Sequence, residues 1–178
     1  MKAISIITLM ILLAVAVSAE DAEKNNPWDQ LSFLEGTWEG TGDGISGKSE
    51  VTQTFEFILG DNFLKVQTKS VFKPQEKNPK GEVHENLAVF SYDETNMRFV
   101  IRAFYVEGFV NKYVLSETAD KGNVLIFVTE SVENAPAGTK AKLIFEHVSE
   151  NEMKESFFVA FPGQEFGCFS TNILTKKE

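Results

Sequence analysis

Apolar and polar residues alternate along most of the chain, and this alternation predicts β-strands. After residue 35 the apolar positions are mainly β-branched or aromatic, and no helical repeat persists for more than one turn. Clusters of Gly, Pro, Asn and Asp separate the alternating segments. The predicted strands are residues 36–44, 51–59, 62–73, 82–92, 97–106, 109–117, 123–132, 140–149, 152–161 and 166–175.

The short connections between these segments predict that each strand pairs with its neighbours in the sequence. A long antiparallel meander is expected to curl and close, because closure removes its exposed edges. We therefore expect an all-β fold, a single closed antiparallel meander barrel of about ten strands, wide enough to enclose a cavity. A short helical turn is expected before it, since Trp28, Leu31 and Leu34 share one helical face.

The first residues have the pattern of a secretory signal peptide. Lys2 precedes an apolar run from Ala3 to Val17, which is shorter than the roughly 20 residues that span a bilayer. Small residues end at Ala19, so we expect residues 1–19 to be cleaved, residues 20–30 to be a flexible segment and residues 31–177 to form the barrel. We therefore expect a secreted or periplasmic protein. The alternative is that the apolar run is not cleaved and stays as a membrane anchor.

The net charge limits the possible binding partners, and the cysteine content limits the possible disulfides. The formal net charge of −9 disfavours nucleic acid and anionic membrane surfaces, and no membrane insertion is expected after cleavage. The oligomeric state stays open. The single cysteine, Cys168, forms no internal disulfide, and its apolar strand predicts a small buried side chain.

Strand phase selects candidate cavity residues around the turn at Glu107-Gly108. A two-residue turn would put Lys112 on the solvent face, because lysine is rarely buried. The opposite, inward face would then carry Arg102, Phe104, Asn111 and Tyr113. Arg102 beside Tyr113 is typical of an anchor for an anion or carboxylate, although an internal carboxylate could hold the same arginine without a ligand.

The hairpin over residues 140–161 gives a second set. A three-residue loop sets Glu146 opposite Lys154 on the outside, which turns Phe145, His147 and Phe157 inward. A lone histidine in such a wall is usually structural, and the phase of His84 stays undecided. The 16 phenylalanines are a large amount of ring surface for one core, which suits lining a pocket as well as packing the interior. The expected walls are Phe104, Phe127, Phe145, Phe157 and Phe169.

No catalytic motif accompanies these residues. The sequence has neither a Gly-rich phosphate loop nor a GxSxG elbow, and two histidines and one cysteine at distant positions make no zinc site. A nucleophile pair of Cys168 and His147 has no activating surroundings in the sequence. We therefore expect a protein that is not an enzyme and holds no metal.

Three segments carry a family resemblance. Residues 34–42 read LEGTWEGTG, residues 87–93 LAVFSYD and residues 99–110 FVIRAFYVEGFV. Together they resemble the calycin superfamily over residues 31–177, and are most similar to bacterial lipocalin-like and nitrobindin-like barrels, with fatty-acid-binding proteins as relatives. The resemblance implies a ligand-binding barrel in which a basic residue, here Lys176 or Lys177, packs over Trp38 to close the base.

The resemblance also implies haem as a candidate ligand. Nitrobindin-like barrels hold haem through a late histidine, but no histidine follows His147, and Cys168 is the only soft ligand in the last strand. We expect a non-enzymatic exported barrel that binds a hydrophobic or amphipathic anionic molecule. The alternatives are a haem-binding barrel with His147, or less readily His84, as axial ligand, and a ligand-free interaction module with a filled interior.

Overall fold

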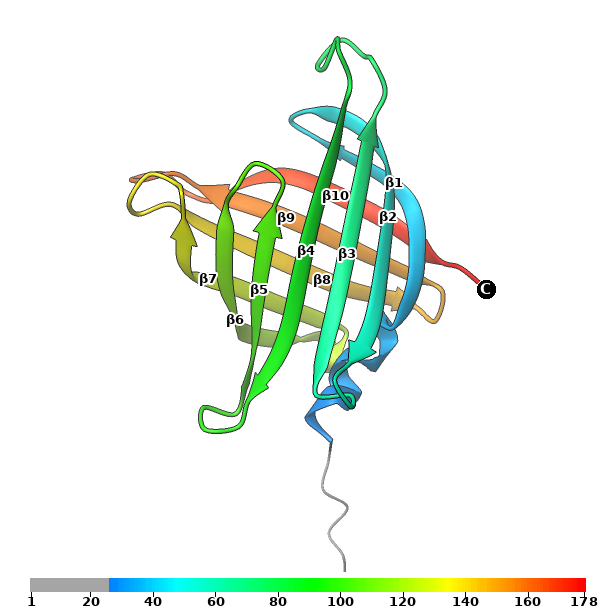
Figure 1. Cartoon of the computed structure of the whole chain (residues 1–178), viewed down its shortest axis with the longest axis vertical. Helices are drawn as coiled ribbons and strands as arrows, with labels where there is room; N and C mark the ends of the chain where they lie inside the picture. The colour runs from blue at the N-terminus through cyan, green and yellow to red at the C-terminus, as the bar shows by residue number, and fades with distance from the viewer. Residues whose placement is uncertain (1–25) are drawn as a thin grey trace, which may run out of the picture.

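The computed structural model describes residues 26–178, which form a closed barrel of ten antiparallel strands (Figure 1). Each strand pairs with its sequence neighbours, and β1 pairs with β10, so the predicted closed meander is confirmed. The strands are β1 (Gly36–Gly44), β2 (Gly47–Ile58), β3 (Phe63–Phe72), β4 (Glu82–Asp93), β5 (Arg98–Tyr105), β6 (Val110–Ala119), β7 (Val124–Glu133), β8 (Lys140–Ser149), β9 (Glu152–Ala160) and β10 (Gly167–Lys176).

Two short 3₁₀ helices complete the fold: η1 (Pro27–Leu34) and η2 (Asp120–Gly122). Residues 27–30 of the segment predicted to be flexible are therefore helical. The predicted signal peptide, residues 1–19, lies outside the described residues, as do residues 20–25. In the described part of the chain no helix is long and apolar enough to cross a membrane.

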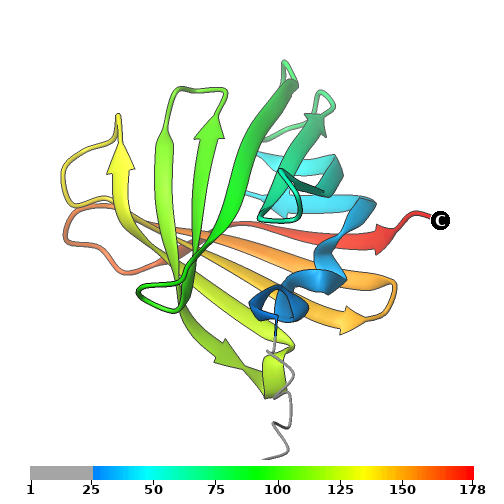
Figure 2. The same ribbon diagram turned by 60° about the horizontal axis from the view of Figure 1, so that its bottom comes forward.

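Helix η1 closes one end of the barrel (Figure 2). The Asn26 side chain accepts a hydrogen bond from the Trp28 backbone N–H, and Pro27 occupies the first turn, where its missing N–H costs nothing. The Trp28 ring packs edge-on against Phe57 and Phe99, at 5.4 and 4.9 Å between centroids. Leu31 and Leu34 on the same helix are fully buried and plug this end.

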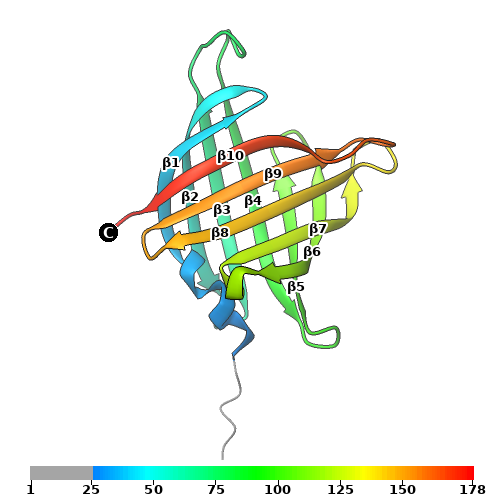
Figure 3. The same ribbon diagram turned by 180° about the vertical axis from the view of Figure 1, so that it is seen from behind.

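The pairing of β1 with β10, here called the seam, depends on glycines in β1 (Figure 3). A Cβ at Gly40 would overlap the carbonyl oxygen of Ile173, and one at Gly42 would lie 2.5 Å from Asn172 Oδ1. Because these positions carry no side chains, the backbones of β1 and β10 can approach each other. The Asn172 side chain then fits inside the barrel beside Gly42. The first and last strands can therefore close the sheet.

Trp38 anchors β1 to η1 and to the last strand. Its indole Nε1–H donates to the Leu34 carbonyl oxygen at 2.7 Å, and its side chain is fully buried. Lys176 is its cross-strand partner, and Lys176 Nζ lies 5.4 Å from the ring centroid. Lys177 instead pairs with Glu39 at 2.8 Å. Of the two lysines considered for this contact, the structure brings Lys176 to the ring.

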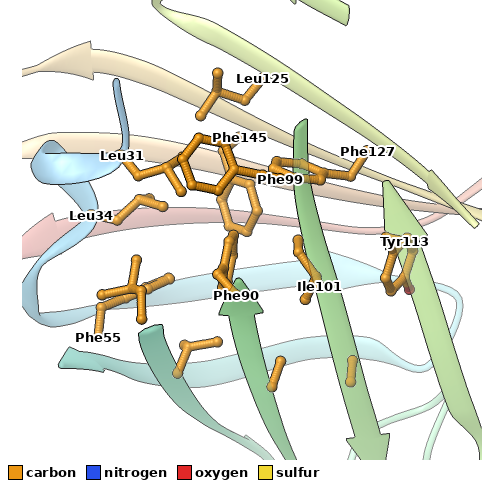
Figure 4. Close-up of a cluster of buried hydrophobic side chains, with 14 of the residues drawn as sticks. Leu31, Leu34, Phe55, Phe90, Phe99, Ile101, Tyr113, Leu125, Phe127 and Phe145 are labelled. Atoms are coloured by element: carbon orange, nitrogen blue, oxygen red, sulfur yellow. The ribbon is translucent and has the colours of Figure 1, made fainter. Parts of the chain in front are cut away.

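Four phenylalanines form an aromatic cluster beside Leu31 and Leu34 of η1 (Figure 4). Phe55, Phe90, Phe127 and Phe145 come from four different strands and are each at most 2% exposed. Their centroids lie 5.8–6.5 Å apart in tilted or edge-to-face pairs, which are the favoured geometries for aromatic rings. These four rings, here called the floor cluster, fill the barrel interior at the end where η1 lies.

The hairpin between β5 and β6 corrects one sequence prediction. The connection has three residues, 106–108, because the Tyr105 N–H bonds to Phe109 O and Gly108 takes a positive φ of 89°. A three-residue loop shifts the register by one position relative to the predicted two-residue turn. Phe104 therefore pairs with Val110 instead of Asn111.

As a consequence, Arg102 and Phe104 point outward, contrary to prediction. Arg102 is exposed and its NH1 donates to Ser91 Oγ at 3.1 Å, while Phe104 is 47% exposed. On β6 the predicted inward phase of Asn111 and Tyr113 is found, since both are buried. The error is thus confined to β5, whose inward residues include Ala103.

Cys168 is exposed, so the prediction of a buried thiol is wrong. It lies at the start of β10, where the register with β9 shifts between Cys168 and Ser170. A β-bulge turns side chains away from the phase of the rest of the strand. The apolar sequence around Cys168 therefore does not indicate its burial.

Removing the Trp38 side chain tests the role of this anchor. Trp38→Ala should lower the free energy of unfolding by about 3–5 kcal/mol, because a large buried side chain and its hydrogen bond are lost together. Lys176→Met, which removes the cation over the ring and a long hydrogen bond of 3.5 Å from Lys176 Nζ to Phe33 O, should cost about 1 kcal/mol or less. Urea titration of both variants measures the difference; equal costs for the two would contradict this role.

Candidate functional site

A cavity of about 510 Å³ occupies the half of the barrel opposite η1. Its mouth lies among the β1–β2, β3–β4, β5–β6, β7–β8 and β9–β10 connections, which contribute residues to its lining. Phe55, Phe90 and Phe145 of the floor cluster form its base, and Phe157 and Phe169 form an edge-to-face pair on its wall at 6.0 Å. Most of the interior surface is therefore apolar and aromatic.

A carboxylate faces this apolar interior. Glu155 on β9 accepts hydrogen bonds at Oε2 from Asn172 Nδ2 on β10, at 3.1 Å, and from Gln53 Nε2 on β2. These three side chains, here called the carboxylate group, all line the cavity. They come from opposite sides of the seam, so closure of the barrel assembles them.

Burial controls the ionisation of Glu155. The protein surrounds the side chain, although its contact with the cavity keeps it partly accessible. Burial raises the pKa of this carboxyl, and the hydrogen bonds from Asn172 and Gln53 offset only part of that rise. Among the described residues no Lys, Arg or His forms an ion pair with Glu155. The negative charge is thus held by amide dipoles alone.

Two tyrosines lie close to the carboxylate group. The hydroxyls of Tyr105 and Tyr113 are 2.9 Å apart, and Asn111 Nδ2 donates to the Tyr113 hydroxyl at 2.8 Å. Burial raises the pKa of Tyr113 to about 12 and that of Tyr105 well above its usual range, and the charge of Glu155 contributes to both shifts. Both hydroxyls are therefore protonated at neutral pH, and Tyr105 presents its own to the cavity.

Two buried amide oxygens in the cavity wall lack a donor. Gln53 must turn its Nε2 toward the Glu155 carboxylate, which leaves its Oε1 without a partner. Asn111 uses its Nδ2 on Tyr113, and its Oδ1 is likewise unpartnered. Gln53 is 1% and Asn111 5% exposed. Buried acceptors without donors are costly, so these two oxygens are unfavourable for folding.

The mouth is acidic. Asp43, Glu82 and Glu107 line it, and the lining includes neither Lys nor Arg. His84 also lines the mouth, with its Nδ1 2.6 Å from Glu107 Oε1, which settles the phase that the sequence left undecided. These three carboxylates favour a negative potential at the entrance, and Lys77, whose Nζ donates to the carbonyl oxygen of the lining residue Gly44 at 3.2 Å, offsets part of it.

The predicted cavity residues fall into three groups. Phe145, Phe157, Phe169 and Asn111 line the cavity, and Tyr113 contacts it through the Tyr105 hydroxyl. Phe127 lies in the floor cluster. Arg102, Phe104 and His147 do not belong to the lining.

His147 lies at the closed end of the barrel. Its ring stacks on Phe33 of η1 at 4.5 Å, and its backbone N–H donates to Asn123 O. The residues present do not fit a haem held by His147, because this ring packs against η1 and not on the cavity. His84 reaches the mouth, but its Nδ1 is bonded to Glu107.

Sequence reasoning did not select the carboxylate group. Glu155 occupies the same strand phase as Met153 and Phe157, and Gln53 that of Val51 and Phe55. The strand phase that turns Phe157 inward also places Glu155 on the inner face, and a polar residue within an apolar phase is a signal that could have identified both as site residues. Their contact could not be inferred, because it joins β2 to β9 across the seam.

Replacing the carboxyl tests its ionisation. A carboxyl whose pKa is raised by folding binds more protons in the folded state, so its contribution to stability falls as the pH rises through the interval above the unfolded pKa. Glu155→Gln mimics the protonated form and keeps an oxygen for both amide donors. Its melting temperature should exceed that of the wild type at pH 8, and the gap should shrink toward pH 4. A gap that does not depend on pH would contradict the raised pKa.

Comparisons with known proteins support the fold and nothing finer. No protein-family model matches the chain, and no curated protein matches it. The barrel is similar to the crystal structure of Rv2717c from M. tuberculosis, with a TM-score of 0.59 and 16% identity over 85% of this chain and 98% of that chain. A redesigned β-barrel matches with a TM-score of 0.42 and 15% identity over 83% and 94%. The chain is thus a ten-stranded β-barrel similar in fold to Rv2717c.

Proposed function

We propose that this protein is an exported, non-enzymatic barrel that binds a small, largely hydrophobic molecule in its cavity. The observation that carries the proposal is the cavity of about 510 Å³ with an aromatic base and a few converging polar groups. Its volume lies within the range of about 300–1,000 Å³ that is usual for small-molecule sites. Export rests on the signal-peptide pattern of residues 1–19.

An anionic head group is not part of this proposal. It depended on Arg102 as an inward anchor, and Arg102 bonds to Ser91 on the outer surface. The cavity lining has carboxylates and no Lys or Arg to compensate an anion. Haem lacks an axial ligand in His147, and a filled interaction module is disfavoured by the cavity itself. A calycin-type carrier of a hydrophobic ligand agrees best with these features.

Filling the cavity should abolish binding. Ala103 lines the cavity and faces Ala88 and Asn111 on the neighbouring strands, so Ala103→Phe puts a ring into the hollow. N-phenyl-1-naphthylamine, a neutral apolar fluorophore, should bind the wild type with a rise in fluorescence. Its affinity for Ala103→Phe should fall at least about tenfold, or about 1.4 kcal/mol, because the ring takes the ligand's space.

Arg102→Ala is the matched control on the outer face of the same strand. It should bind the fluorophore as the wild type does, because Arg102 does not line the cavity. Circular dichroism verifies that both variants fold. Undiminished binding by a folded Ala103→Phe variant would refute binding in the cavity.

A further inference from the structure

The carboxylate group has no positive partner within the described protein. Glu155 receives two amide N–H donors at Oε2, while its other oxygen, Oε1, has no hydrogen-bond partner among residues 26–178. Burying a carboxylate without a counter-charge is costly, and amide dipoles compensate only part of that cost. A cation from outside the protein would restore the balance.

The surrounding wall has two amide oxygens that receive no hydrogen bond from residues 26–178. Beside Glu155, the Gln53 Oε1 atom is unpartnered, and across the cavity so is Asn111 Oδ1. Both side chains are more than nine-tenths buried and line the cavity. The accessible acceptor in this wall is the Glu155 carboxylate, which an ammonium N–H complements, whereas a carboxylate or phosphate would bring acceptors against an acceptor.

The mouth and the floor restrict the cation further. The acidic residues Asp43, Glu82 and Glu107 around the mouth attract cations and repel anions. Below the carboxylate group, Phe55, Phe90 and Phe145 provide an apolar base for a hydrocarbon or aromatic tail. A small inorganic ion would leave this base without a partner, and an organic cation covers both parts of the cavity.

We propose that the ligand is an amphipathic amine whose ammonium group binds Glu155, with its apolar tail on the floor cluster. This inference rests on the proposed function, because it assumes that the cavity takes a small hydrophobic molecule. It specifies the head group: a cationic hydrogen-bond donor in place of the anion that the sequence predicted.

Three probes with the same ten-carbon tail test the head group. Decylamine, decanol and decanoate are compared by displacement of N-phenyl-1-naphthylamine from the folded, signal-free protein at pH 8 and constant ionic strength. An alkyl amine is protonated at this pH, since its pKa is close to the value of about 10.4 for lysine. Decylamine should bind at least about tenfold more tightly than decanoate, with decanol between them.

Two variants assign this preference to Glu155. Glu155→Gln keeps the side-chain shape and should reduce the preference for decylamine over decanol to less than about twofold. Glu152→Gln makes the same change of charge on an exposed position of the same strand, outside the cavity lining, and should keep the wild-type preference.

The outcomes separate the two proposals. If the fluorophore binds but decanoate competes as well as decylamine, or if Glu155→Gln keeps the preference for the amine, the ammonium site is refuted and the hydrophobic cavity stands. If the fluorophore does not bind the wild type and native mass spectrometry finds no complex with any of the three probes, both proposals fail.

Discussion

Closure of β1 against β10 is the constraint on which the rest of the structure depends. The seam needs glycines in β1, because a side chain at Gly40 would overlap the backbone of β10. Once closed, the sheet has no free edge and encloses an interior that can exclude water. The same closure brings Gln53, Asn172 and Glu155 together from β2, β10 and β9, so barrel and polar site form in one step.

The two ends of the barrel differ in how their side chains fill the interior. At one end η1, Trp38 and the floor cluster pack together as part of the buried hydrophobic core. At the other end the side chains leave a cavity that exposes aromatic rings and a carboxylate with a raised pKa. Glu155 is unfavourable for folding, and under the proposed function a ligand would compensate that cost.

Two hairpins, around residues 107 and 150, show how far the sequence predicted the site. Around residue 150, lysines and glutamates fixed the outer phase, and Glu146 pairs with Lys154 as predicted. Around residue 107 the same logic failed on one strand, because a three-residue loop with Gly108 at positive φ replaced the assumed two-residue turn. A one-residue change in loop length reverses every side chain of the strand, so Arg102 moved from the cavity to the surface.

The sequence by itself determined the strands, the meander and the closed barrel, because alternation and turn residues are local properties that a single segment carries. It also indicated which rings were available for a pocket. Only the tertiary structure decided which end is packed, where Arg102 and His147 lie, and that Glu155 meets Gln53 without a positive partner. These features join residues on distant strands, and their contacts depend on the register and shear of the closed sheet, which no local pattern encodes.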